Sequence, residues 1–162
     1  MWEQYADNHA GVCLVFDRAV LLDSLEHNLG ADGAYWEGPV KYTVAGFAAS
    51  RARNINLDKF HERSLEDDVA EHVLEHHEEF FLLKTEDWAS EFEYRFVFQP
   101  ASDRKLTLPI RFVSYGNALR SVVVGERFPE WQLPSARAIA RDARVVLRRM
   151  TWKDSRPYLM SA

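Results

Sequence analysis

The stretch Ser90-Glu91-Phe92-Glu93-Tyr94-Arg95-Phe96-Val97-Phe98 (SEFEYRFVF) alternates charged and aromatic side chains with a period of two. Successive side chains of a strand point to opposite faces of its sheet, so this period predicts a β-strand over residues 91–98. One face would carry the aromatic rings and the other the charged groups Glu91, Glu93 and Arg95. Burial of four aromatic rings outweighs any gain from the charged row, so we predict that the aromatic face is core.

The pattern of apolar, glycine and proline residues predicts the elements on either side of this strand. A short helix or turn is expected over residues 2–8, and helices over 17–28, 57–83 and 134–140, with Asp17 and Asp58 as caps. A loop is expected over 31–38, and further strands over 11–16, 39–44, 106–114, 121–124 and 143–152. The continuous apolar run 11–16 is predicted to be buried on both faces. Together these elements predict an α+β fold, with residues 1–162 as a single domain. We expect a mixed, mostly antiparallel sheet covered by two or three helices.

Composition excludes several classes of protein. With 162 residues and 47% hydrophobic side chains, the chain has enough material for a core, and its net charge of −5 argues against a nonspecific nucleic-acid binder. No apolar run approaches the ~18 residues of a membrane span, and the first residues do not resemble a signal peptide. Cys13 is the only cysteine and forms no internal disulfide, which favours a cytoplasmic protein. Within an apolar strand, Cys13 is expected to be inert packing rather than a nucleophile.

The charged row of the opening strand is the first candidate site. Glu91 and Glu93, two residues apart, would have Cα atoms roughly 7 Å from each other. Such carboxylates can raise one another's pKa or together hold a cation or a sugar hydroxyl, whereas Arg95 would keep Glu93 ionised. The alternative is a solvated face with weak charge pairing.

A second candidate lies on the helix expected over residues 57–83. His72-Val73-Leu74-Glu75-His76 has the HxxEH spacing of an inverted zinc-peptidase motif, which places both histidines on one helix face with Glu75 as a general base. The alternative is a solvated polar face, with Val73 and Leu74 marking the buried side. We assign no metal ligand and keep a zinc hydrolase as a weaker hypothesis.

The N-terminus offers a third candidate. If residues 2–9 are helical, Trp2, Tyr5 and His9 lie on one side, where they could stack on a nucleobase or a nicotinamide. The alternative is an amphipathic lid over the sheet.

Three segments, MWEQYADNHAGVCLVFD, LLKTEDWASEFEYRFVF and VVVGER, resemble the bacterial domain-of-unknown-function family DUF2971. The second segment contains Lys84 and Trp88 as well as the charged row. The resemblance carries no secure biochemical function. It implies an additional N-terminal region with further strands, so we expect the chain to be a shortened member of the family.

The Glu-x-Glu pair is in turn similar to the site of arginine-directed ADP-ribosyltransferases, a likeness at the level of the fold. There the second glutamate binds a ribose hydroxyl of NAD and stabilises an oxocarbenium-like transition state, and the first orients the acceptor. The resemblance implies a nucleotide- or NAD-handling enzyme with Glu93 as principal carboxylate, Glu91 as helper, Arg95 as ion-pair partner and NAD as cofactor. The expected ligand-binding residues are Trp2, Tyr5, His9, Lys84 and Trp88. A non-catalytic binding or interaction domain, acting in a defence or stress operon, is the alternative.

Overall fold

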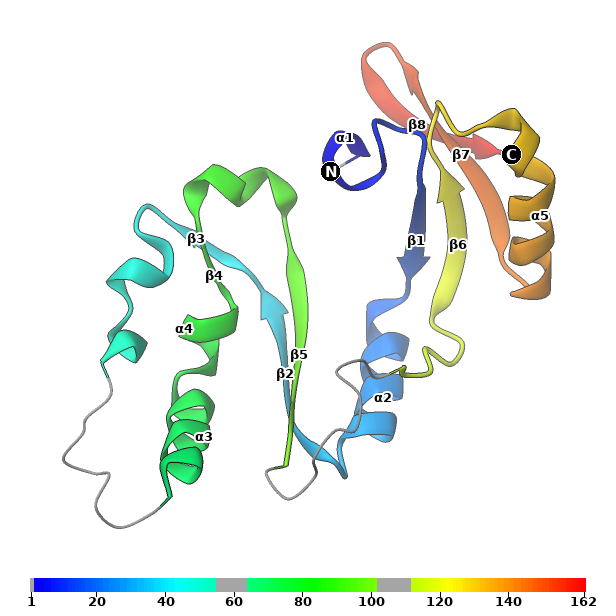
Figure 1. Ribbon diagram of the computed structural model, residues 1–162. Helices are drawn as coiled ribbons and strands as arrows, with labels where there is room; N and C mark the ends of the chain where they lie inside the picture. Colours follow the sequence, from blue (N-terminus) through cyan, green and yellow to red (C-terminus); the bar gives the residue numbers. More distant parts are fainter. Residues whose placement is uncertain (1, 55–63, 102–111) are drawn as a thin grey trace. The chain divides into compact units, whose positions relative to one another are not determined.

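The computed structural model describes residues 2–54, 64–101 and 112–162 (Figure 1). It divides into two compact units, which are described separately. Unit 1 comprises residues 1–28 and 112–162, and unit 2 comprises residues 29–111. The prediction of an α+β fold with a mixed, mostly antiparallel arrangement of strands is confirmed. A single-domain organisation stays a prediction. The expected Asp58 cap and most of the strand expected over 106–114 lie outside the described residues.

Unit 1 contains a four-stranded mixed sheet with the strand order β1-β6-β7-β8. β6 and β7 run parallel, and the other two pairs are antiparallel. The strands are β1 (Val12–Phe16), β6 (Leu119–Val124), β7 (Val146–Lys153) and β8 (Arg156–Ser161). β6 contains the strand expected over residues 121–124, and β7 lies within the strand expected over 143–152 except for Lys153. β8 has no sequence-based prediction.

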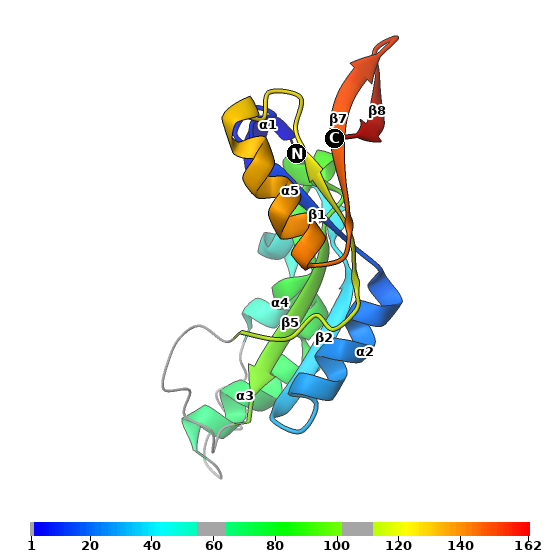
Figure 2. The same ribbon diagram turned by 90° about the vertical axis from the view of Figure 1, so that its right-hand side faces the viewer.

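A helix connects the two parallel strands, as parallel pairing requires. This helix, α5 (Leu133–Asp142), carries Pro134 in its first turn and lies against one face of the sheet (Figure 2). Small and large apolar side chains from the helix, the strands and the preceding loop form one buried cluster: Val122, Val124, Phe128, Leu133, Ala136, Ala140 and Leu147. This cluster is the core of unit 1.

The prediction that residues 11–16 are buried on both faces is wrong. Val12 and Leu14 are 44% and 52% exposed, and Cys13 is exposed as well. β1 is the edge strand of its sheet and pairs with β6 alone among the described strands. A continuous apolar run is typical of a central strand, but position in the sheet decides burial.

The helix expected after β1 is confirmed as α2 (Arg18–Leu29). Its cap is Asp17, whose carboxylate accepts a hydrogen bond from the backbone N–H of Val20 at 3.2 Å. The N-terminal helix is shorter than expected. α1 (Trp2–Tyr5) is followed by three consecutive residues with positive φ, Asp7, Asn8 and His9, which no α-helix accommodates.

Unit 2 contains two strand pairs. β2 (Gly33–Pro39) pairs antiparallel with β5 (Tyr94–Pro100), and β3 (Lys41–Thr43) pairs parallel with β4 (Leu83–Thr85). The loop expected over residues 31–38 is therefore largely strand. The glycines of this segment are typical of loops, but pairing along all of β5 makes it extended.

The helix expected over residues 57–83 is interrupted. α3 (Leu65–Glu75) begins at the cap residue Ser64, whose hydroxyl accepts a hydrogen bond from the N–H of Asp67 at 3.2 Å. His76 leaves the helical region at φ −116° and ψ 21°, and α4 (His77–Phe81) begins after it. Two short 3₁₀ helices, η1 (Gly46–Ala49) and η2 (Arg51–Arg53), precede α3 in the chain.

The opening stretch forms a strand only from Tyr94 onward. Glu91 is the last residue of the 3₁₀ helix η4 (Glu86–Glu91), and Phe92 adopts the left-handed conformation at φ 48° and ψ 46°. Phe92 is 87% exposed, whereas Glu91 is 5% exposed. Phe96 is 39% exposed as well, and Tyr94 and Phe98 are only half-buried. The prediction that the aromatic face is core is therefore wrong: the left-handed conformation breaks the alternation at Phe92, and no described element buries the ring of Phe96.

Candidate functional site

Four charged side chains of unit 2 meet in what we call the charged cluster: Lys84, Glu91, Glu93 and Arg95. The Lys84 ammonium forms an ion pair with the buried Glu91 carboxylate and lies 3.0 Å from Oε2 of Glu93. β4 supplies Lys84, the end of η4 supplies Glu91, and β5 supplies Arg95. The structure thus brings together four residues that the sequence singled out.

Arg95 completes the cluster with a bidentate pair. Its Nε and Nη2 donate to the two carboxylate oxygens of Glu93 at 2.6 and 3.0 Å, and its Nη1 donates to the carbonyl of Phe81 at 2.6 Å. The backbone N–H of Glu93 donates to the hydroxyl of Tyr42 at 3.0 Å. Contacts from β3, β4 and β5 therefore fix the position of Glu93, and α4 in turn holds Arg95.

These contacts keep both Glu93 and Lys84 charged. Hydrogen bonds from Arg95, reinforced by Lys84, lower the pKa of Glu93 from 4.5 to about 2. Hydrogen bonds to Glu91 and then Glu93 raise the pKa of Lys84. Glu93 is therefore ionised near neutral pH and is unsuited to give or take protons there. What it offers is a fixed negative charge.

The left-handed Phe92 makes this arrangement geometrically feasible. In a regular strand Glu91 and Glu93 would lie roughly 7 Å apart along one face. The turn at Phe92 instead lets both carboxylates contact the same ammonium group. A bulky residue with positive φ is uncommon and costs on the order of 1–3 kcal/mol, so the surrounding contacts must enforce it.

Trp88 lies beside the cluster. Its ring centroid is 5.1 Å from the Lys84 ammonium, a cation–π distance, and 43% of the residue is exposed. Trp88 therefore presents an accessible aromatic surface next to Lys84.

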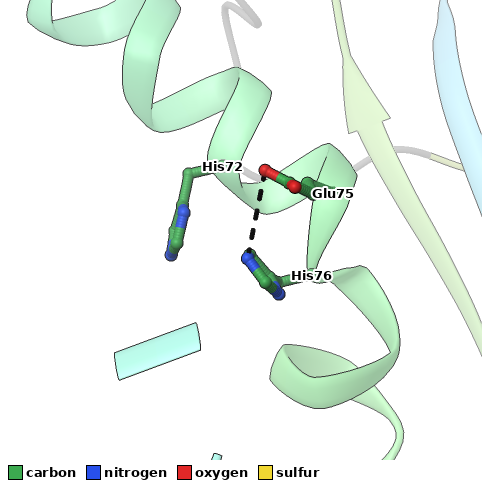
Figure 3. Close-up of side chains that lie close together, drawn as sticks. All are labelled: His72, Glu75 and His76. Carbon is green, nitrogen blue, oxygen red and sulfur yellow. Dashed lines mark ion pairs between the residues drawn. The ribbon is translucent and has the colours of Figure 1, made fainter. Parts of the chain in front are cut away.

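A second group of polar side chains lies on the last turn of α3. His72, Glu75 and His76 each place a potential ligand atom within 4.8 Å of the others, and Figure 3 shows the three side chains converging. Both histidines are half-buried, whereas Leu74 is exposed. The expectation that Leu74 marks the buried side is therefore wrong, whereas the solvated face that the alternative expects holds for Glu75, whose side chain is 67% exposed.

The N-terminal candidates lie in unit 1. The rings of Trp2 and His9 stack with their planes 5° apart and their centroids 6.1 Å apart, and the edge of Trp152 packs against His9. Tyr5 is exposed. The stack arises from the turn after α1 rather than from a continuous helix. Trp152, which completes it, carries no signal in the sequence because it comes from β7, far away along the chain.

Gly125 lies next to this turn for a steric reason. A Cβ atom at this position would lie 2.0 Å from the carbonyl oxygen of His9. The N–H of Gly125 also donates to the carbonyl of Gly11 at 3.0 Å. Close backbone approach explains this glycine.

Unit 1 also contains an apolar hollow of about 450 Å³ between β1 and α5. Val12, Leu14, Trp131 and Ile139 are among the residues that line it. None of the candidate residues named from the sequence lines this hollow in the described part of the chain. Its residues come from segments more than 100 positions apart, so no local motif could have indicated it.

Within the ranges that the structure describes, no helix is both long and apolar enough to cross a membrane. No curated protein matches this chain, and no solved structure matches it. One family model does match, over residues 1–96, and it describes a protein of unknown function, DUF2971. That match contains Trp2 and His9 of the N-terminal aromatic stack and all four residues of the charged cluster. The chain therefore belongs to the DUF2971 family.

Proposed function

We propose that unit 2 handles NAD or a related nucleotide at the charged cluster, with chemistry of the ADP-ribosyltransferase type. The observation that carries the proposal is Glu93, an ionised carboxylate held rigidly by Arg95 while 31% of its side chain stays accessible. A fixed charge of this kind stabilises positive charge that develops in a transition state, because no reorganisation is needed during the reaction.

The reaction breaks the bond between the ribose C1′ and the nicotinamide nitrogen. Nicotinamide leaves with the bonding electron pair and becomes neutral, while positive charge develops on the ribose. Glu93 would accept a hydrogen bond from a ribose hydroxyl and stabilise that charge. An acceptor nucleophile then bonds to C1′ and releases its proton to solvent. In this scheme Glu93 provides electrostatic stabilisation and transfers no proton, in keeping with its pKa of about 2.

The neighbouring residues receive different roles. Trp88 supplies an exposed ring on which a base or nicotinamide can stack, a contact worth about 1–3 kcal/mol per base. Glu91 is too deeply buried to orient an acceptor, so we assign it a positioning role through its ion pair with Lys84. A carboxylate has about four acceptor positions, and the N–H donors of Arg95 and Lys84 use three of those of Glu93, so a ribose hydroxyl can donate to Oε1, which accepts from Arg95 alone among these donors. Pocket-wall roles for Trp2, Tyr5 and His9 stay predictions.

A titration with NAD tests the proposal. NAD should raise the melting temperature of the wild-type protein, and Glu93→Gln should abolish NAD turnover while the circular dichroism spectrum is preserved. Trp88→Ala should weaken NAD binding without loss of fold. Glu78→Gln is a matched control, because Glu78 is also ion-paired in unit 2 but lies on the surface with Lys41.

Absence of any NAD effect on the folded wild-type protein would overturn the proposal. That result would favour the other class of function, a non-catalytic binding or interaction domain in which the charged cluster is structural. Equal turnover by wild type and Glu93→Gln would likewise remove Glu93 from the mechanism.

A further inference from the structure

We propose that His72, Glu75 and His76 form a binding site for a divalent transition metal ion, with zinc favoured by the donor set. Two imidazoles and one carboxylate are a common ligand set of catalytic zinc sites. The site is independent of the charged cluster and of the nucleotide chemistry proposed there.

The spacing of the three ligands suits a single ion. His72 and Glu75 lie on the last turn of α3, and His76 is the residue that ends the helix, with its backbone N–H still bonded to the carbonyl of His72. Oε2 of Glu75 lies 4.0 Å from Nε2 of His76, and the centroids of the two imidazole rings lie 4.6 Å apart. Tetrahedral zinc with bonds of about 2.0–2.1 Å places its ligand atoms about 3.3 Å apart. The ligand atoms therefore need to move by no more than about 1.5 Å.

Glu75 is the ligand that can make this adjustment. Its side chain is 67% exposed, so it can change rotamer without disturbing packed residues. The histidines are half-buried and held by other contacts. In the HxxEH interpretation Glu75 is a general base, but here it lies near enough to be a ligand itself.

The hydrogen-bond partners of the histidines leave the appropriate nitrogen atoms available. Nε2 of His72 lies 2.8 Å from the carbonyl oxygen of Ala52. A carbonyl only accepts hydrogen bonds, so this nitrogen carries the proton and Nδ1 keeps its lone pair for a metal. Nδ1 of His76 lies 3.3 Å from Oε1 of Glu79, which leaves Nε2, the nitrogen that faces Glu75. Metal-binding histidines generally have such a carbonyl or carboxylate partner on the opposite nitrogen.

These partners are themselves held in place. The Ser50 hydroxyl donates to the Glu79 carboxylate, and the N–H of Ala52 donates to Ser50 Oγ at 2.9 Å. Ala52 is fully buried. The Glu79 carboxylate thus accepts a hydrogen bond from Ser50 while it contacts Nδ1 of His76. The outer partners of the site are thus preorganised by the segment around η2.

Charge favours a dication at this position. Glu75 and Glu79 carry two negative charges beside the two imidazoles, and a divalent ion would balance them. Three protein ligands leave a fourth tetrahedral position for water. This inference concerns binding of the ion and assigns no reaction to it.

The experiment uses the full chain, stripped with a chelator and titrated with Zn²⁺ by calorimetry. Wild type should bind one ion per chain, and cobalt substitution should give the visible absorption of tetrahedral Co²⁺. His76→Ala and Glu75→Gln should each weaken zinc binding by at least 10-fold. Glu79→Gln should weaken it by about 10–100-fold, because it removes an outer partner.

His77→Ala is the matched control. His77 lies in the same region, but its ring stacks on Trp36 at 5.0 Å and its Nδ1 contacts the carbonyl of Leu74. Its loss should leave zinc affinity unchanged. Failure of the wild type to bind zinc stoichiometrically, or a Glu75→Gln variant indistinguishable from His77→Ala, would overturn the site. Because Glu75 is exposed, Glu75→Gln should fold like the wild type. The comparison of Glu75→Gln with His77→Ala therefore decides the question even if a histidine variant does not fold.

Discussion

Val124 in unit 1 and Glu91 in unit 2 are both almost completely buried, and they are buried for different reasons. Val124 belongs to a cluster of apolar side chains between a sheet and a helix. Glu91 is a charged residue whose burial depends on the Lys84 ammonium. Unit 1 therefore derives its stability from area removed from water. In unit 2 part of the interior depends on ion pairs, which stabilise only while every partner is present.

The largest effect is expected in unit 1. Phe128→Ala removes a buried ring from the apolar cluster and should lower the free energy of unfolding by about 3–5 kcal/mol. Urea denaturation followed by circular dichroism measures it. Phe112→Ala, at an exposed phenylalanine of the same unit, should change stability by about 0.5 kcal/mol or less. Similar losses from both variants would contradict the assignment of the core.

A smaller loss is expected from Glu91→Gln in unit 2. The change keeps the shape of the side chain but removes the buried charge that Lys84 contacts. It should lower the free energy of unfolding by about 1–3 kcal/mol, as measured by urea denaturation. The exposed pair of Glu78 with Lys41 provides the comparison, because Glu78→Gln should cost about 1 kcal/mol or less. If Glu78→Gln lowers the free energy of unfolding as much as Glu91→Gln does, burial does not make one ion pair contribute more to stability than the other.

The third effect depends on pH. The pKa of Glu93 is lowered in the folded protein from 4.5 to about 2, so its ion pair stabilises the fold fully above pH 4.5. That stabilisation is lost as the pH falls from about 4.5 to about 2, because the unfolded chain takes up the proton first. The stability difference between wild type and Glu93→Gln should therefore shrink across this range. A difference that is constant between pH 5 and pH 2.5 would show that Glu93 acts through something other than its charge.

The smallest effect is expected at the turn that joins the two glutamates. Phe92→Gly removes an exposed ring and relieves a left-handed conformation, while it adds freedom to the unfolded chain. These terms oppose one another, so stability should change by about 1 kcal/mol or less. A loss comparable to that of Phe128→Ala would mean that the Phe92 ring is packed in solution.

The two units also differ in how well their sequence predicts them. Unit 1 has strong local signals: the cap Asp17 before α2, the apolar run ending at Val124, and Pro134 at the start of α5. Each prediction depended on a few adjacent residues, and each element formed as expected. In unit 2 the break at His76 and the strand β2 were missed, because distant partners decide both.

For the candidate site too, the sequence predicted the residues but not their arrangement. Lys84, Glu91, Glu93 and Arg95 were named from the sequence, and the structure brings them together. Their arrangement was not predictable, because strict alternation gave no sign of a left-handed residue at position 92. The role of Ala52 and Glu79 beside the histidines was also hidden, since a backbone carbonyl has no residue-specific signal.

By itself, the sequence determined the α+β class, the helix that Asp17 caps, the family, and the residue types that any chemistry here requires. Only the tertiary structure decided which side chains are buried. It exposed the apolar run of β1 by placing it at a sheet edge, and it buried Glu91 by placing Lys84 against it. The physical reason is that periodicity defines the faces of an element, whereas burial depends on what packs against each face. In SEFEYRFVF one backbone conformation, at Phe92, separated the predicted faces from the observed ones.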